Sequence, residues 1–176
     1  MVNKLLVTGG IRSGKTGLAE QRARDAGTDV VYVATATAGD AEMAERIRHH
    51  RQQRPDHWGL VEEPVGLGGV VADLGDREGA VPLLLVDCMS LWLSNLLFAE
   101  GALLQPERAA FLDEVEAYPG PLVIVTNEVG LGTIGMDPLT RRFADELGWL
   151  NQALARRCDE VVMAVAGLPL TLKAGG

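Results

Sequence analysis

The sequence predicts an α/β fold of three layers, with a mostly parallel sheet that is covered by helices on both faces. Short apolar runs alternate with helical patterns, the runs are apolar at nearly every position, and the first is followed by a glycine-rich turn. Continuously apolar strands are typical of parallel sheets that are buried between helices. At 176 residues, 47% of them hydrophobic, the chain can form a substantial core, and we expect a single domain over 1–176.

The expected elements follow one another in a strand–helix rhythm. A helix over 41–53 ends before Pro55, because proline disfavours the helical conformation in the residue that precedes it. Another helix begins with Pro106 in its first turn, where the missing N–H is tolerated. The tail 173–176 is expected to fray. The expected strands are 5–7, 30–34, 60–62, 81–87, 122–125 and, last, 161–166, and the expected helices are 16–25, 41–53, 67–74, 90–100, 106–118 and 139–157.

A glycine-rich motif follows the first expected strand. In such a motif successive backbone N–H groups face one concavity that holds phosphate oxygens. A lysine near its end adds charge at the outer phosphates, and the hydroxyl after it binds Mg²⁺. The alternative is a plain strand-to-helix turn with a surface lysine, but the flanking strand and helix favour a phosphate-binding loop (P-loop) and a nucleoside triphosphate ligand. The motif reads Gly9, Gly10, Ile11, Arg12, Ser13, Gly14, Lys15, Thr16.

An acidic residue, Asp87, ends the apolar run 83–87. Ligands of open α/β sheets bind beyond the carboxyl ends of the strands, and an acid there holds Mg²⁺ in phosphate-loop enzymes. The alternative role is a cap for the helix that follows immediately. Given the glycine motif upstream, we expect Thr16 and Asp87 to form a Mg²⁺ site.

Composition excludes several other classes of protein. The net charge of −8 argues against a general nucleic-acid binder, which would carry a basic excess. No apolar run reaches the roughly 18 residues of a membrane span, and no leader-like segment precedes the first strand, so we expect a cytoplasmic protein. Cys88 and Cys158 are too few for a zinc site or a disulfide framework and are expected to be reduced thiols.

Two of the three histidines, His49 and His50, lie in the expected helix 41–53. At about 100° per residue, His50 falls on the apolar stripe with Met43 and Ile47, whereas His49 falls on the polar side. Adjacent histidines face different directions, which disfavours a metal site. For His49 the pattern favours a solvated surface position, and the alternative is a nucleophile, because a neutral imidazole can attack phosphorus.

Several blocks of sequence, taken together and in order, resemble one family. They are the glycine motif and residues 32–36, 46–51, 54–58, 87–97 and 125–132. The chain resembles the bifunctional adenosylcobinamide kinase/adenosylcobinamide-phosphate guanylyltransferases of cobalamin biosynthesis. The resemblance implies phosphorylation of adenosylcobinamide with ATP or GTP. It also implies transfer of GMP from GTP, through a GMP-histidine intermediate, to give adenosylcobinamide-GDP.

The resemblance also implies site residues and assembly. It gives the GMP-carrying role to the first histidine of the pair, His49. Lys15 is the second expected catalytic residue, because its charge would stabilise the transferring group. A homo-oligomer, suggested to be a trimer, is expected. Residues 132–138 depart from the family pattern, which leaves the handling of the corrinoid open. Two other functions stay open as well: another phosphate-loop small-molecule kinase, and a nucleotide-gated interaction module that uses the apolar segment 91–98. The implied nucleotide contacts are the glycine motif with Ala34, Thr35, Ala36, His50, Arg51, Gln52, Gln53, Glu62 and Asp87.

Overall fold

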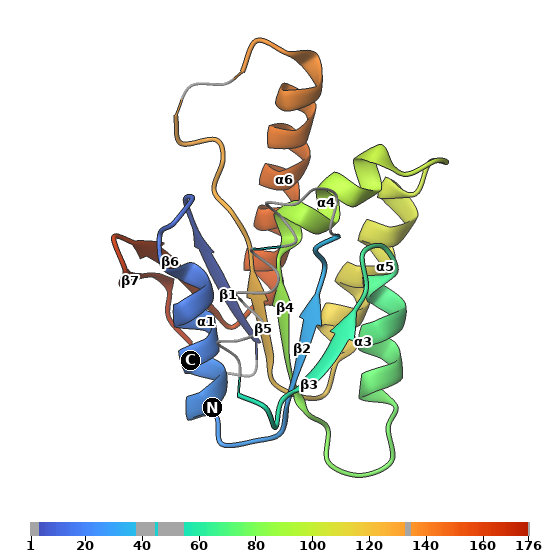
Figure 1. Ribbon diagram of the computed structural model, residues 1–176, viewed down its shortest axis with the longest axis vertical. Coiled ribbons are helices and arrows are strands. Elements are labelled where there is room, and N and C mark those ends of the chain that lie inside the picture. Colours follow the sequence, from blue (N-terminus) through green and yellow to red (C-terminus); the bar gives the residue numbers. More distant parts are fainter. Residues whose placement is uncertain (1–3, 38–44, 46–54, 133–134, 176) are drawn as a thin grey trace.

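The computed structural model describes residues 4–37, 45, 55–132 and 135–175. Within these ranges one seven-stranded sheet has the order β3-β2-β4-β5-β1-β6-β7 (Figure 1). Every neighbouring pair is parallel except β6 and β7, which pair antiparallel. The prediction of a mostly parallel sheet is therefore confirmed. The strands are β1 (Lys4–Gly9), β2 (Val30–Ala34), β3 (Gly59–Glu62), β4 (Leu83–Asp87), β5 (Leu122–Val125), β6 (Glu160–Val165) and β7 (Leu168–Lys173).

Helices cover both faces of the sheet, but unequally. Among the described helices, α1 lies on one face, and α3, α4, α5 and α6 lie on the other (Figure 1). The three-layer prediction is thereby confirmed. The helices are α1 (Lys15–Asp25), α3 (Leu67–Gly75), α4 (Met89–Phe98), α5 (Leu104–Ala117) and α6 (Pro138–Arg157).

Successive side chains of the central strands pack alternately into two hydrophobic cores, one on each face of the sheet. In β1, Leu5 and Val7 pack in the cluster that includes Ala19 of α1, whereas Leu6 packs in the opposite cluster with Trp92 of α4. Successive side chains of a strand point to opposite faces, so a strand between two helical layers must be apolar at every position. This is why the apolar runs of the sequence identified the strands.

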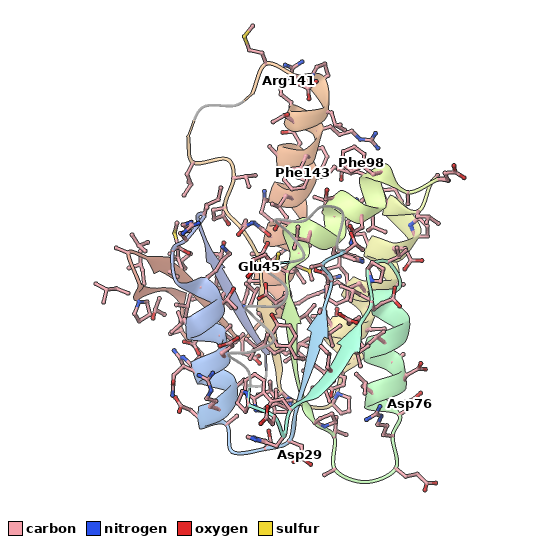
Figure 2. All side chains as sticks on the ribbon, viewed as in Figure 1. Asp29, Glu45, Asp76, Phe98, Arg141 and Phe143 are labelled. Atoms are coloured by element: carbon pink, nitrogen blue, oxygen red, sulfur yellow. The ribbon has the colours of Figure 1, made fainter. Side chains whose placement is uncertain are left out.

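The strand order decides where the functional residues meet. β5 pairs with β1 on one side and with β4 on the other, although it is far from both along the chain. The carboxyl ends of β1, β5 and β4 therefore lie next to one another at one edge of the sheet. The N-terminal part of α6, with Arg141, extends beyond this edge (Figure 2).

Two details of the fold differ from the sequence prediction. Helix α5 begins at Leu104, so Pro106 is its third residue rather than its start. The expected last strand is followed by another, because Ala166 (φ 52°) and Gly167 (φ 80°) form a tight turn that folds β7 back onto β6. Positive φ at both central residues is the geometry of a two-residue hairpin turn. Pro169 argues against a strand in the sequence, but it is tolerated here because β7 is an edge strand.

The expected helix 41–53 lies outside the described residues, apart from Glu45, which is helical and exposed. In the part of the chain that the structure describes, no helix combines the length and the apolar character that crossing a membrane requires.

Candidate nucleotide-binding site

The glycine motif forms a turn that connects the carboxyl end of β1 to the start of α1. Gly14 is the residue before the helix and has φ 91°, a conformation that L side chains rarely adopt. A Cβ at Gly14 would also lie 3.1 Å from Gly167 Cα. The backbone N–H of Gly167 donates to the carbonyl of Ser13 (2.9 Å). The β6–β7 turn therefore packs against the outside of the loop, and the positive φ and the close approach to Gly167 both favour a glycine at Gly14.

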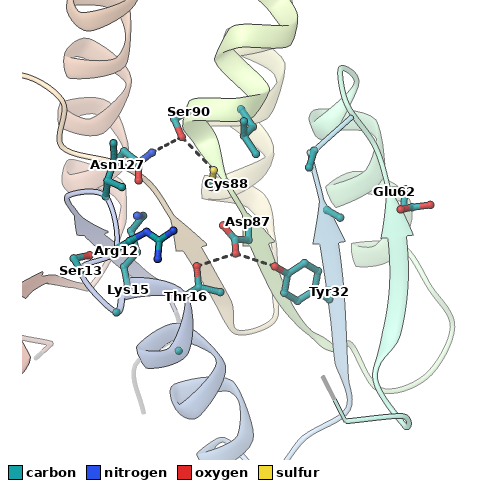
Figure 3. Close-up of a pocket in the computed structure, with 16 residues that line it drawn as sticks. Arg12, Ser13, Lys15, Thr16, Tyr32, Glu62, Asp87, Cys88, Ser90 and Asn127 are labelled. Carbon is teal, nitrogen blue, oxygen red and sulfur yellow. Dashed lines mark hydrogen bonds between the residues drawn. The ribbon is translucent and has the colours of Figure 1, made fainter. Parts of the chain in front are cut away.

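The charged end of the loop carries Lys15, the first residue of α1. Its ammonium group donates to the carbonyl oxygen of Gly10 at 3.0 Å, so the side chain lies back over the loop. Arg12 lies beside it at the same cavity (Figure 3). Two cations therefore accompany the N-terminus of α1, where the helix dipole already favours an anion.

Asp87 turns toward the loop instead of capping a helix. Helix α4 is capped by Cys88 without a side-chain hydrogen bond, so the capping alternative is wrong. The Oδ2 atom of Asp87 accepts hydrogen bonds from the hydroxyl of Thr16 (3.1 Å) and from the hydroxyl of Tyr32 (2.8 Å) (Figure 3). Tyr32 is 4% exposed, so its ring fixes the direction from which it donates. The strand-end acid and the loop threonine are thus in direct contact.

The oxygen atoms around Asp87 fit a magnesium ion. Mg²⁺ prefers hard oxygen ligands and is commonly held by one or two protein groups together with substrate phosphates and water. Thr16 and Asp87 supply a hydroxyl and a carboxylate of this kind. Within the described residues there is no group of three or more His, Cys, Asp or Glu side chains that could hold a metal. The donor set therefore matches Mg²⁺ better than zinc.

A cavity of about 550 Å³ joins these groups. Thr35 is not in its wall: it is buried, and its hydroxyl bonds to both the N–H (2.8 Å) and the carbonyl (2.9 Å) of Cys88. Thr35 therefore ties the end of β2 to the end of β4. The cavity is lined by residues 11–17 of the loop and α1 and by Tyr32, Ala34, Ala36, Glu62, Asp87, Cys88, Ser90, Leu91 and Asn127.

Tyr32, Ser90 and Asn127 are wall residues that the sequence analysis did not single out for a role. The Nδ2 of Asn127 donates to the hydroxyl of Ser90 (2.8 Å), and that hydroxyl lies 3.1 Å from the Cys88 sulfur. Burial, with a smaller contribution from the charge of Asp87, raises the pKa of the Cys88 thiol to about 11, so it is protonated at neutral pH. For Asn127 the available signal was a polar residue two positions beyond the apolar strand β5, comparable to the acid that ends β4.

His49, His50, Arg51, Gln52 and Gln53 lie outside the described residues. Of the other expected contacts, Gly9 and Gly10 belong to the loop but not to the cavity wall. A Cβ at Gly9 would lie 2.7 Å from the carbonyl oxygen of Ala164, so this position supports the loop through close packing.

Solved structures with a similar fold share little sequence with this chain. The RadB recombinase matches 91% of this chain and 73% of its own, with a TM-score of 0.53 and 19% identity. An ATPase of a bacterial type III secretion system matches 96% of this chain and 56% of its own, with a TM-score of 0.57 and 12% identity. At these identities the likeness concerns the fold, and it supports the predicted P-loop α/β architecture.

Sequence relatives are more specific. The chain is 48% identical over 169 residues to the bifunctional adenosylcobalamin biosynthesis protein CobP of Pseudomonas aeruginosa, covering 96% of each chain. It is 39% identical over 184 residues to the corresponding CobU protein of Salmonella typhimurium, covering 96% of this chain and 99% of that one. The model of the CobU family, described as cobinamide kinase / cobinamide phosphate guanyltransferase, matches residues 5–172. This chain therefore belongs to the cobinamide kinase / cobinamide phosphate guanyltransferase family.

Proposed function

We propose that the chain phosphorylates the hydroxyl of the aminopropanol arm of adenosylcobinamide with ATP or GTP and then transfers GMP from GTP to the product. The observation that carries the proposal is the family match along residues 5–172, which includes every residue around the cavity of the glycine loop and Asp87. The relatives are named as bifunctional proteins, which supports both reactions on one chain. The final product would be adenosylcobinamide-GDP.

The kinase reaction needs charge neutralisation and in-line positioning more than covalent help from the protein. The loop N–H groups, Lys15 and the N-terminus of α1 would bind the phosphates and stabilise charge on the transferring group. Thr16 and Asp87 would hold Mg²⁺, which when bound neutralises charge on the phosphate oxygens. The open alternatives, a different kinase or an interaction module, receive no support from the family match.

The transfer of GMP needs a nucleophile, and we propose the imidazole of His49. Its neutral nitrogen would attack the α-phosphorus of GTP, forming an N–P bond while the bond to the bridging oxygen breaks and pyrophosphate leaves with the electron pair. The phosphate of the cobinamide product would then displace the histidine. Ala34, Ala36 and Glu62 line the cavity and support the proposed nucleotide contacts there. Further proposed contacts are His50, Arg51, Gln52 and Gln53, whereas Thr35, which is buried and bonded to Cys88, supports the wall from behind.

Covalent labelling tests the histidine. We expect the wild-type protein, incubated with Mg²⁺ and GTP, to retain ³²P from the α position but not from the γ position, in an acid-labile bond. His49→Ala should abolish the label, because the attacking nitrogen is gone. His57→Ala is the matched control, since His57 is exposed and lies outside the cavity wall, and it should retain the label. An unlabelled wild-type protein would contradict the guanylyltransferase half of the proposal.

Assembly and location form a separate part of the proposal. The family resemblance supports a homo-oligomer, suggested to be a trimer. We also propose that the protein works in the cytoplasm. The net charge of −8 supports a small-molecule substrate rather than nucleic acid.

A further inference from the structure

Asn127 lines the cavity but has no part in the function proposed so far. It lies two residues beyond β5, and β5 lies between the strand that leads into the glycine loop and the strand that ends in Asp87. Its side chain therefore faces the same cavity as the loop and Asp87 (Figure 3). Any group that approaches a phosphate bound at the loop would enter the same cavity.

The backbone around Asn127 is held on both sides. The N–H of Thr126 donates to the carbonyl of Val7 (2.9 Å), and the N–H of Glu128 donates to the carbonyl of Gly9 (3.1 Å). The carbonyl of Asn127 itself accepts from the side chain of Asn151 (3.0 Å). The residue is thus fixed relative to the end of β1, and its position does not depend on a free loop.

The side chain of Asn127 is only half satisfied. Its Nδ2 donates to the hydroxyl of Ser90 at 2.8 Å, which orients the amide plane. Its Oδ1 is buried and has no hydrogen-bond partner among the described residues. Buried polar atoms are nearly always paired by protein, ligand or water, so a ligand that brings a hydrogen-bond donor into this cavity would satisfy the carbonyl oxygen of Asn127.

The chemistry of the missing partner narrows the choice of ligand. Phosphate oxygens are acceptors and cannot pair with a carbonyl oxygen. The kinase substrate, in contrast, brings a hydroxyl to the γ-phosphate. We infer that Oδ1 of Asn127 accepts a hydrogen bond from the hydroxyl of the cobinamide arm and holds its oxygen beside the terminal phosphate. This inference rests on the proposed function and assigns a residue to its first substrate.

The transfer itself balances without a proton on Asn127. The hydroxyl oxygen forms a bond to the γ-phosphorus, the bond from that phosphorus to the bridging oxygen breaks, and the nucleoside diphosphate leaves with the electron pair. The hydroxyl proton is released to water, because an amide oxygen is too weak a base to keep it. Asn127 therefore contributes position, which is a large part of what phosphoryl transfer requires.

Binding measurements with two acceptors test this contact. The acceptors are cobinamide and an analogue whose arm lacks the hydroxyl, each titrated in the presence of Mg²⁺ and a non-hydrolysable ATP analogue. We expect wild type to bind the hydroxylated acceptor about tenfold more tightly, the value of one good hydrogen bond. Asn127→Ala should reduce this ratio to about one or two. Its affinity for the ATP analogue should stay within about twofold, which also shows that the variant is folded.

A second variant keeps the test informative. Ser90→Ala leaves Oδ1 in place but removes the hydrogen bond that orients it, so its ratio should fall between those of wild type and Asn127→Ala. An unchanged ratio in both variants would overturn the inference alone. So would an equal loss of affinity for the ATP analogue in Asn127→Ala, since that pattern belongs to an amide whose nitrogen contacts phosphate. If wild type binds no cobinamide at all, the proposed function fails as well.

Discussion

The hydrogen bond from Tyr32 to Asp87 orients the carboxylate of the proposed Mg²⁺ site. The carboxylate has many possible orientations at the end of β4, and the tyrosine hydroxyl selects the one in which Oδ2 also contacts Thr16. Because the ring of Tyr32 is buried in β2, its hydroxyl cannot follow the carboxylate to another position. Groups that orient a metal ligand commonly influence metal affinity almost as strongly as the ligands themselves.

Tyr32→Phe should therefore weaken the proposed Mg²⁺ site. We expect the Mg²⁺ concentration for half-maximal GTP binding to rise about tenfold, because outer partners of metal ligands commonly contribute 10- to 100-fold to affinity. The measurement is a titration with Mg²⁺ of GTP binding to protein that carries no covalent GMP.

The other tyrosine of the chain provides the matched control for this titration. The Tyr118 hydroxyl donates to the carbonyl of Pro82 (2.7 Å) in the core packed against the opposite face of the sheet. Tyr118→Phe should lower thermal stability without changing the Mg²⁺ midpoint. An equal shift in the two variants would mean that the effect of Tyr32→Phe is general destabilisation.

At the scale of elements, the close packing of α3 on α5 depends on a glycine. A Cβ built on Gly68 would lie 3.0 Å from the backbone carbon and from the Cβ of Ala110, and 3.1 Å from the backbone nitrogen of Phe111. Two of these atoms belong to the backbone of α5, which cannot move aside as a flexible side chain would. The next glycine, Gly69, is exposed and has no such neighbour within 4 Å.

This pair of adjacent glycines gives opposite predictions for one substitution. Gly68→Ala should lower the free energy of unfolding by about 1–3 kcal/mol, the usual cost of overpacking. Gly69→Ala should raise it by about 0.5–1 kcal/mol, since alanine loses less backbone entropy in a helix. Urea denaturation of both variants measures the difference. A stabilising effect at both positions would show that the two helices can separate without cost.

At the scale of the whole molecule, the burial of ionisable groups makes the stability of the fold depend on pH. Burial is the main cause that raises the pKa of Cys88 to about 11, of Cys158 to about 12 and of Tyr118 to about 12. Both cysteines are free of disulfide bonds and buried. Each group is therefore held in its neutral form in the native state and ionises more easily when the chain unfolds.

Stability should consequently fall in alkaline solution. Above pH 9, the ordinary cysteine value, unfolded thiols lose protons that the native state retains, so the unfolded state binds fewer protons and stability decreases as pH rises. Each group contributes a slope of at most about 1.4 kcal/mol per pH unit. The free energy of unfolding is measured by urea denaturation. We expect the contribution of these groups to it to be nearly constant from pH 7 to 8.5 and to fall steeply by pH 10.5. Cys158→Ala should show a shallower fall, and a flat profile in wild type would contradict the prediction.

The sequence by itself determined the layered parallel sheet, the phosphate-binding loop and the acid opposite it. These features are local: an apolar run shows a buried strand, and a glycine motif between a strand and a helix shows the loop. The contact between Thr16 and Asp87 also followed, because the carboxyl ends of parallel strands share one edge of the sheet. The role proposed for His49 came from the family resemblance, and it remains a prediction.

Only the tertiary structure decided which distant segments became neighbours. The order of the strands places β5 between β1 and β4, and so brings Asn127 into the cavity, while Tyr32 reaches Asp87 from β2. The turn at Gly167 adds β7 and supports the glycine loop through Ser13. Strand order results from the packing of helices and sheet across the whole chain, and no pattern within a few residues encodes it. The fold class was therefore readable from the sequence, whereas the side chains that complete the site were not.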